Sequence, residues 1–228
     1  EDTIAAIATA VGVGGIGIVR VSGPEALGVG DRVFRARRGG KVSEQRTYTA
    51  RYGRVVDPRT GEAIDEALAL VMRAPASYTR EDVVELHCHG GPVALRLALE
   101  AVLAAGARLA APGEFTERAF LHGRIDLAQA EAVADIIRAQ TDAGLVVARR
   151  QLEGRLSAAV RRVSEELLAL AAQLEVGIDF PEEDIPELAP AELAKRLEGA
   201  ARELERLLAG GRRGRVLREG LPTVIVGK

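Results

Sequence analysis

The spacing of hydrophobic residues changes near Thr116 and divides the chain into two parts. From residue 3 to about 111, short runs rich in β-branched residues alternate with a few longer apolar segments. Short runs of this kind, bounded by turn residues, are typical of β-strands. After Thr116 the apolar residues recur every three or four positions almost to the end, which is the period of an amphipathic helix. The pattern predicts an α+β chain, with a mixed α/β domain at residues 1–117 and a helical bundle domain at 118–219.

The first part contains both strand-like and helix-like segments. Each helix-like segment carries a proline in its first turn, where a missing N–H costs nothing, and the second segment ends near Gly106. Residues 57–61 have the composition of a turn between two strands. The predicted strands are 3–9, 16–22, 47–56, 66–72 and 82–89, and the predicted helices are 23–34 and 91–107.

The second part carries one long apolar stripe, which predicts a single helix from about residue 145 to 174, packed in a bundle. The same spacing returns at 190–208. Between these segments, residues 179–188 contain two prolines and an acidic cluster, which indicate a connection. The first stripe consists of Leu145, Ala148, Leu152, Leu156, Val160, Val163, Leu167, Leu170 and Leu174, and the second contains Leu193, Leu197, Leu204 and Leu207.

The sequence ends in a short apolar run that belongs to neither domain. Residues 223–226 lead into Gly227 as a strand leads into a glycine turn. One interpretation is the first strand of a nucleotide-binding domain, in which Gly227 would begin the phosphate-binding loop G-x-x-x-x-G-K-[ST]. The other interpretation is an ordinary C-terminal strand, and the local pattern leaves both open.

Composition narrows the class of protein. A hydrophobic content of 47% is enough for packed cores, and a formal net charge of −2 gives no overall attraction to nucleic acid. Cys88 is the only cysteine, so the chain forms no internal disulfide, which suits a reducing compartment. Since the sequence also contains no long uninterrupted apolar run, we expect a cytoplasmic protein without a membrane-spanning segment.

Two motifs invite cofactor hypotheses that their context weakens. Residues 12–17 fit the dinucleotide fingerprint G-x-G-x-x-G, but they open a β-like run where that site needs a helix N-terminus. A glycine loop between two strands, which lets the backbone approach a ligand or a partner subunit, fits better. His87 and His89 share one strand face, Cys88 points to the other, and no partner ligands follow, so we expect no metal site. Glu85 shares the face of His87.

Basic residues gather in two places. Either cluster could meet phosphate, or it could form an ordinary solvated surface. No nucleophile elbow or complete hydrolase constellation accompanies them. The first cluster contains Arg35, Arg37, Arg38 and Lys41, and the second contains Arg212, Arg213, Arg215 and Arg218.

Three long segments carry a more specific signal. They read "DTIAAIATAVGVGGIGIVRVSG" at 2–23, "SYTREDVVELHCHGGP" at 77–92 and "PGEFTERAFLHGRIDLAQAEAVADII" at 112–137. Two shorter segments, "DFPEED" at 179–184 and "LREGLPTVIVG" at 217–227, follow in order. Together they resemble the signature segments of the MnmE family of tRNA-modification GTPases, also called TrmE. The resemblance extends over essentially the whole chain.

The resemblance offers an interpretation of the final strand. In that family a Ras-like GTP-binding domain begins after the "REG" segment, which implies that residues 220–228 are its first strand and that Gly227 starts its phosphate loop. The rest of the loop lies beyond Lys228, so we expect this chain alone neither to bind nor to hydrolyse GTP. GTP, K⁺ and Mg²⁺ would then serve only the longer protein.

For residues 1–117 the resemblance implies a tetrahydrofolate-binding fold similar to that of the glycine-cleavage aminomethyltransferase, which also forms the homodimer. Arg20, Glu85 and Arg124 match the positions that contact 5,10-methylenetetrahydrofolate or 5-formyltetrahydrofolate in the family. A carboxylate suits the amino-pyrimidinone edge of a pterin, and guanidinium groups suit a carbonyl or the glutamate tail. The glycines expected in a loop near the folate are Gly14, Gly15 and Gly17.

This chain departs from the family's usual residues at three single positions and at 10–15, where "AVGVGG" lacks the usual proline-rich opening. Arg80 stands where many relatives have Gly, His122 where they have Asn, and Arg124 where they have Lys. The exchange at Arg124 keeps the positive charge but changes the hydrogen-bond geometry.

The resemblance also implies a reaction shared with a flavin-dependent partner, MnmG or GidA. A one-carbon unit from the folate is attached to C5 of the tRNA wobble uridine, giving an aminomethyl or carboxymethylaminomethyl group, and no catalytic residue for this step is assigned. Two alternatives remain open. The chain could be a stand-alone folate-dependent aminomethyltransferase, or a dimerisation and docking module without a ligand.

Overall fold

A computed structural model describes residues 2–179, 189–219, 224, 226 and 227, and for 212–219 it describes only the backbone. Contacts divide the chain into two compact units, Glu1–Ile125 and Asp126–Lys228. Residue 117, the end of the predicted first domain, lies inside helix α3 (Glu114–Leu121). The first unit is a mixed α/β structure and the second is helical, so the predicted α+β fold class is confirmed.

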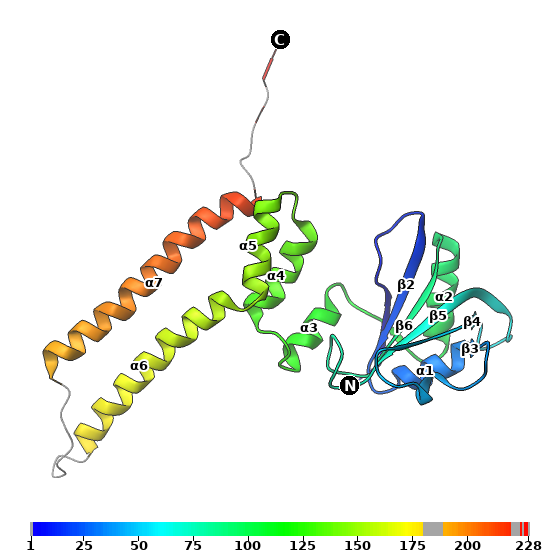
Figure 1. The fold of residues 1–228 in the computed structure, drawn as a ribbon, viewed down its shortest axis with the longest axis horizontal. Coiled ribbons are helices and arrows are strands. Elements are labelled where there is room, and N and C mark those ends of the chain that lie inside the picture. Colours follow the sequence, from blue (N-terminus) through cyan, green and yellow to red (C-terminus); the bar gives the residue numbers. More distant parts are fainter. Residues whose placement is uncertain (1, 180–188, 220–223, 225, 228) are drawn as a thin grey trace. The chain divides into compact units, whose positions relative to one another are not determined.

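The first unit is built on a seven-stranded sheet with the order β3-β4-β5-β6-β2-β1-β7 (Figure 1). Its paired strands are antiparallel, except that β1 and β7 run parallel. The five predicted strands are present, and short edge strands that the pattern did not predict close both sides. The strands are β1 (Ile4–Ile7), β2 (Gly14–Ser22), β3 (Phe34–Ala36), β4 (Thr49–Val56), β5 (Ala63–Met72), β6 (Val83–Gly90) and β7 (Arg108–Leu109).

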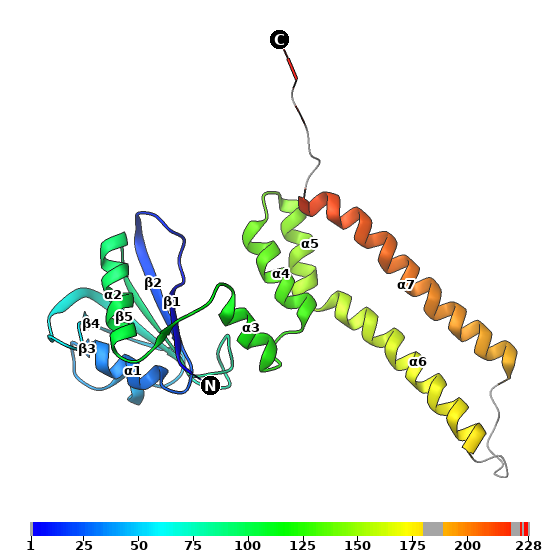
Figure 2. The same cartoon turned by 180° about the vertical axis from the view of Figure 1, so that it is seen from behind.

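One face of this sheet packs against α1 (Ala26–Val33) and α2 (Pro92–Ala104) (Figure 2). Strand residues of alternating parity, including Val19 and Leu86, are fully buried there because side chains alternate across a strand. Both predicted helices are therefore present, with shorter limits. A short 3₁₀ helix, Val42–Glu44, follows β3.

The opposite face, which we call the second face, carries the side chains of the other parity. Arg20 on β2, Glu85 and His87 on β6, and Leu68 on β5 belong to it by strand register. Tyr52 on β4 lies opposite Leu68 and belongs to the same face. The candidate folate residues of the two central strands therefore project away from the helical core.

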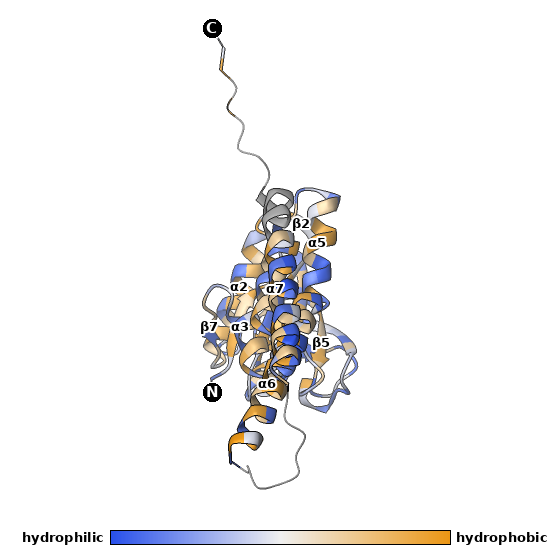
Figure 3. Cartoon of the chain, turned by 90° about the vertical axis from the view of Figure 1, so that its left-hand side faces the viewer, coloured by the Kyte–Doolittle hydropathy of each residue, from blue (hydrophilic) through white to orange (hydrophobic). Residues whose placement is uncertain are grey.

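In its described residues, the second unit contains four helices: α4 (Leu127–Arg138), α5 (Asp142–Leu152), α6 (Arg155–Asp179) and α7 (Pro190–Glu219). Asp126 begins α4 by accepting a hydrogen bond from the Gln129 backbone N–H at 2.9 Å, and Thr141 begins α5 in the same way through Gly144. Hydrophobic and hydrophilic residues both line α6, as its sequence pattern predicts (Figure 3).

The predicted single helix across residues 145–174 is wrong, because α5 ends at Leu152 and α6 begins at Arg155. Gly154 between them has φ of +78°, a left-handed conformation that ends a helix and favours glycine. The predicted apolar stripe is only partly buried: Ala148, Val163 and Leu170 are buried, whereas Leu145, Leu156, Val160, Leu167 and Leu174 are exposed.

Two predictions fall largely outside the described residues. The acidic connection at 179–188 follows the last residue of α6, and residues 180–188 are not described. In the predicted strand 220–228, only Val224, Val226 and Gly227 are described, and none of these three has regular secondary structure. Within the described part of the chain, no helix combines the length and the hydropathy needed to cross a membrane.

Candidate functional site

Arg20 and Glu85 form an ion pair at the centre of the second face. They lie directly opposite each other on β2 and β6, and Arg20 Nε donates to Glu85 Oε1 at 2.8 Å. Glu85 is only 7% exposed, so its carboxylate needs partners to offset the loss of hydration. The structure thus joins two residues that stand 65 positions apart in the sequence.

His87 contacts the other oxygen of the same carboxylate. Its Nε2 lies 3.1 Å from Glu85 Oε2, and both side chains project from one face of β6. An ionised carboxylate offers about four lone-pair positions, so these two contacts leave acceptor capacity for a ligand. Glu85 is therefore a buried acceptor held in place from two sides.

Aromatic rings connect this ion pair to Arg124. The Arg20 guanidinium carbon lies 5.9 Å from the centre of the Tyr78 ring and 5.6 Å from that of Phe115. The Arg124 guanidinium carbon lies 4.7 Å from the same Tyr78 ring. Arg20, Glu85 and Arg124 therefore share one neighbourhood, in which cation–π contacts orient both guanidinium groups.

A cavity of about 450 Å³ opens beside this cluster. Arg124 and Tyr78 line it, whereas Arg20 and Glu85 do not. Its size falls within the range of small-molecule sites, and its wall combines aromatic, aliphatic and cationic side chains. The cavity is lined by Tyr48, Met72, Pro75, Ala76, Ser77, Tyr78, Arg80 and Arg124.

Arg80 and His122 contact each other. Arg80 Nη1 donates to the His122 carbonyl at 3.0 Å, and the His122 ring Nδ1 lies 2.6 Å from the Thr79 carbonyl. Arg80 has φ of +62°, a left-handed conformation for which glycine is the default residue. These contacts tie the loop that carries Tyr78 to the segment that carries Arg124.

A buried polar network holds the loop that carries Tyr78. Ser22 donates to Glu81 Oε2 at 2.7 Å and shares a 2.6 Å hydrogen bond with Thr79. Arg118 on α3 donates to Glu81 Oε1 at 2.8 Å. No local sequence pattern assigns these contacts, because only the fold brings the three segments together.

An ion cluster fixes the start of α3, which carries Phe115. Arg108 Nη2 lies 2.6 Å from Glu114 Oε1, and the hydrogen bond from Arg108 lowers the pKa of Glu114 to about 2. Arg118 also contacts Glu114, at 3.1 Å. The acidic side chain at the first turn of the helix favours it further through the helix dipole.

The glycines expected in a loop near the folate lie instead at the start of β2. Gly14, Gly15 and Gly17 all belong to this strand. A Cβ at Gly17 would lie 2.7 Å from Leu95 Cδ2 and 2.8 Å from Leu95 Cγ, so glycine is needed there for the packing of α2. A Cβ at Gly15 would meet nothing within 4 Å.

His89 forms a second carboxylate pair further along β6. Its Nδ1 lies 2.7 Å from Asp65 Oδ1, and its backbone N–H donates to Asp65 Oδ2 at 2.8 Å. The hydrogen bond to Asp65 raises the pKa of His89. Cys88, on the opposite face, is buried, and burial raises the pKa of its thiol to about 12.

Comparison with known proteins places both units in one family. Residues 3–124 match the family described as "GTP-binding protein TrmE N-terminus", and residues 127–222 match "MnmE helical domain". Three similar relatives are each named "tRNA modification GTPase MnmE". They come from Geobacter sulfurreducens, Symbiobacterium thermophilum and Bacillus velezensis, at 57%, 56% and 51% identity over the full 228 residues.

The chain spans about half the length of these relatives, covering 49% to 50% of each. The first match ends, and the second begins, on either side of the division between the two structural units at Ile125. The chain belongs to the TrmE family, whose relatives here carry the name MnmE.

Proposed function

We propose that this chain is the folate-binding and dimer-forming part of a longer tRNA-modification GTPase. The observation that carries the proposal is the buried Glu85 carboxylate, held by Arg20 and His87 beside Tyr78 and Arg124. Aromatic rings, guanidinium groups and a buried carboxylate are the groups that a reduced folate requires.

Each of these residues suits one part of the folate. Glu85 would accept two parallel hydrogen bonds from the amino-pyrimidinone edge of the pterin, using its remaining lone pairs. The rings of Tyr78 and Phe115 offer flat apolar surface to the pterin or the aminobenzoyl group. Arg124, which is exposed at the cavity wall, is placed to meet the anionic glutamate tail.

When bound, 5,10-methylenetetrahydrofolate supplies a one-carbon unit. In the longer protein this unit would be attached to C5 of the wobble uridine in tRNA, together with the flavin-dependent subunit MnmG. GTP, K⁺ and Mg²⁺ would act in the GTP-binding domain of the longer protein. The first unit would form the homodimer, and a cytoplasmic location fits such a reaction.

Two other functions would use the same fold. A stand-alone aminomethyltransferase would need no helical unit, whereas this chain matches its family through both units. A docking module without a ligand would leave the buried charge of Glu85 unexplained except as structure. A folate titration separates this second alternative from the proposal.

The test is isothermal titration of the chain with 5-formyltetrahydrofolate, comparing the parent with Glu85→Gln. The amide replaces one acceptor by a donor, so we expect binding at least about tenfold weaker, because hydrogen bonds to charged groups contribute about 1.5–3 kcal/mol. Glu100→Gln, which changes an exposed carboxylate on α2, is the matched control and should bind like the parent. Equal affinity in Glu85→Gln would place the pterin elsewhere, and no binding by the parent would favour the docking module.

A further inference from the structure

Positive charge gathers along one side of the first unit, away from the ion pair of the candidate folate site. Residues 31–54 contain eight basic and two acidic residues, although the whole chain has a net charge of −2. This segment includes the edge strand β3 and its neighbour β4. The excess of positive charge is therefore local, and it lies on a sheet edge.

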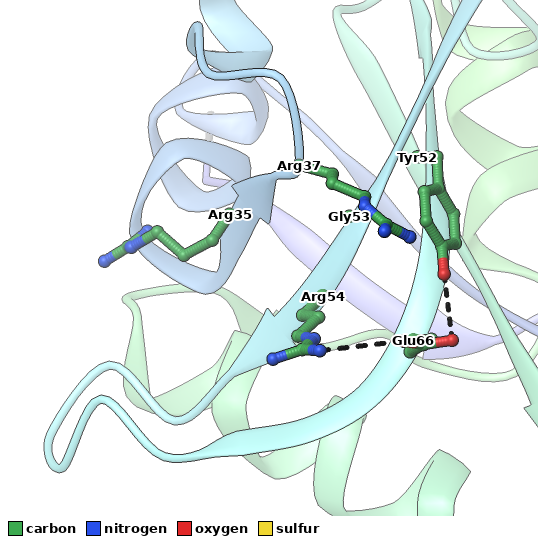
Figure 4. Close-up of a pocket in the computed structure, with 6 residues that line it drawn as sticks. All are labelled: Arg35, Arg37, Tyr52, Gly53, Arg54 and Glu66. Carbon is green, nitrogen blue, oxygen red and sulfur yellow. Dashed lines mark hydrogen bonds and ion pairs between the residues drawn. The ribbon is translucent and has the colours of Figure 1, made fainter.

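Two arginines of this edge face each other across the strands. Arg35 on β3 lies directly opposite Arg54 on β4. Like charges in this position destabilise a sheet. The Arg35 guanidinium turns away and donates to the Asp31 and Phe34 carbonyls at 2.8 Å and 3.0 Å, while Arg54 reaches Glu66 at 3.8 Å (Figure 4).

A third arginine lies over an aromatic ring. The Arg37 guanidinium carbon is 5.8 Å from the centre of the Tyr52 ring, and the Tyr52 hydroxyl donates to Glu66 at 2.9 Å (Figure 4). Tyr52 is 43% exposed, so much of its ring remains accessible. A cavity of about 480 Å³ lies between these side chains, lined by Arg35, Arg37, Tyr52, Gly53, Arg54 and Glu66.

In the part of the chain that the structure describes, most of this charge has no counter-ion. Among the described residues, no carboxylate lies within ion-pair distance of Arg35, Arg37 or Arg38, and Glu66 is the acidic residue that contacts Arg54. Arg37 and Arg38 are exposed. An open surface with several unpaired guanidinium groups beside an accessible ring matches the chemistry of single-stranded and looped RNA, whose phosphates are anionic and whose bases stack.

We propose that the surface formed by Arg37, Arg38, Tyr52 and Arg54, the basic edge, binds the phosphate backbone of tRNA, with Tyr52 stacking on a base. This inference rests on the proposed function, since it takes tRNA as the substrate of the longer protein. Arg35 contributes charge while its guanidinium caps the carbonyls at the end of α1. A small anion would need donors that converge on one point, whereas the Arg35 guanidinium turns toward the end of α1 and Arg54 points toward Glu66.

Strand register connects the basic edge to the candidate folate site. Tyr52 pairs with Leu68, and Leu68 pairs with His87, so all three lie in one row across the second face. Neighbouring strands lie about 4.8 Å apart, which places β4 and β6 about 10 Å from each other. RNA held at the basic edge would therefore lie on the same face as Glu85, within reach of the folate-binding side of the sheet.

The test measures the binding of a fluorescein-labelled, unmodified tRNA transcript by anisotropy at about 50 to 200 mM salt. The variant Arg37→Gln/Arg54→Gln removes two charges and leaves Arg35 to cap α1. If both arginines contact phosphate, the slope of log affinity against log salt falls by about 1.5. The matched control, Arg59→Gln/Arg96→Gln, removes two exposed charges of the same unit and should keep the parent's slope.

Tyr52 supplies a second, independent readout. Tyr52→Ala should weaken tRNA binding by about tenfold or more, because stacking on an aromatic side chain contributes at least that much per base. Tyr52→Phe loses only the hydroxyl contact to Glu66 and should bind like the parent.

The surface would be refuted if the arginine variant and the control bound tRNA with the same slope, or if the parent bound no tRNA. Titrating the arginine variant with 5-formyltetrahydrofolate keeps the two proposals apart. Retained folate binding with weakened tRNA binding supports the basic edge. Absence of folate binding in the parent would refute the folate site, and the measured tRNA affinities would still test the basic edge.

Discussion

A methyl group added at Gly17 should destabilise the first unit by forcing α2 away from β2. Gly17 is buried, and an alanine Cβ there would lie within 2.8 Å of Leu95 Cγ and closer to both methyl carbons. Leu95 is 5% exposed and belongs to the hydrophobic core. Overpacking of a filled core costs about 1–3 kcal/mol, so we expect Gly17→Ala to lower the free energy of unfolding by this amount.

The first unit can be observed by itself in the intact chain. All three tyrosines, Tyr48, Tyr52 and Tyr78, lie in this unit, and the sequence contains no tryptophan. Tyrosine fluorescence during urea unfolding therefore reports on the first unit, which avoids treating a two-unit chain as a single transition. Gly15→Ala is the matched control, since its Cβ meets nothing within 4 Å and it changes the unfolded chain in the same way.

A double variant identifies the steric cause. Leu95→Ala alone should cost about 2–5 kcal/mol through the cavity that it leaves, and adding Gly17→Ala to it should cost little more because the overlap is gone. If Gly17→Ala unfolded at the same urea concentration as Gly15→Ala, the packing explanation would be wrong. Unchanged stability with weakened folate binding would instead return Gly17 to the ligand-contacting role expected from the sequence.

Two further predictions concern backbone conformation and pH. Gly154→Ala should destabilise the second unit by about 1–2 kcal/mol, because a Cβ is disfavoured at φ of +78°. Thermal melting followed by helical circular dichroism measures this loss of stability, and an unchanged melting curve would contradict the prediction. The pKa of Glu114 falls from its ordinary 4.5 to about 2 in the folded chain, so its ionised form stabilises the fold above pH 4.5 and this contribution disappears as the pH falls toward 2. Glu114→Gln should therefore be less stable than the parent at pH 6, and this difference in the free energy of unfolding should disappear between pH 4.5 and 2. Urea unfolding followed by tyrosine fluorescence measures the difference, and a difference independent of pH would refute its ionic origin.

Period-two and period-3.6 patterns predicted the parts of the fold that depend on local burial. Side chains of the strand at 82–89 alternate between the core and the second face. The pattern therefore correctly placed Glu85 and His87 on one face and Cys88 on the other. The spacing of the stripe correctly indicated helical structure, but this spacing continues unchanged across residues 152 to 156. Periodicity alone therefore could not reveal the break at Gly154, where a single glycine in the left-handed conformation ends one helix and starts the next.

The contacts of the candidate site join residues far apart in the sequence, and local hydrophobic patterns do not predict such contacts. Arg20 and Glu85 meet because β2 and β6 are neighbours in the sheet, an order that no local spacing specifies. The sequence resemblance supplied both residues and Arg124, but it gave no account of what holds them. The hydrogen bond between Ser22 and Glu81 was not predicted, because the role of a buried polar residue is recognised only when its partner is known.

The position of Arg124 depends on contacts made by Arg80 and His122. Its segment is tied to the loop of Tyr78 through the bond from Arg80 to the His122 carbonyl and the contact of the His122 ring with Thr79. A glycine at position 80 would suit the positive φ but could not donate this hydrogen bond. Arg80 has a strained backbone conformation, and its side chain connects the two segments that carry Tyr78 and Arg124. Arg80 and His122 therefore act together in connecting the two segments that carry Tyr78 and Arg124, and the Arg124 guanidinium lies over the ring that Arg20 also contacts.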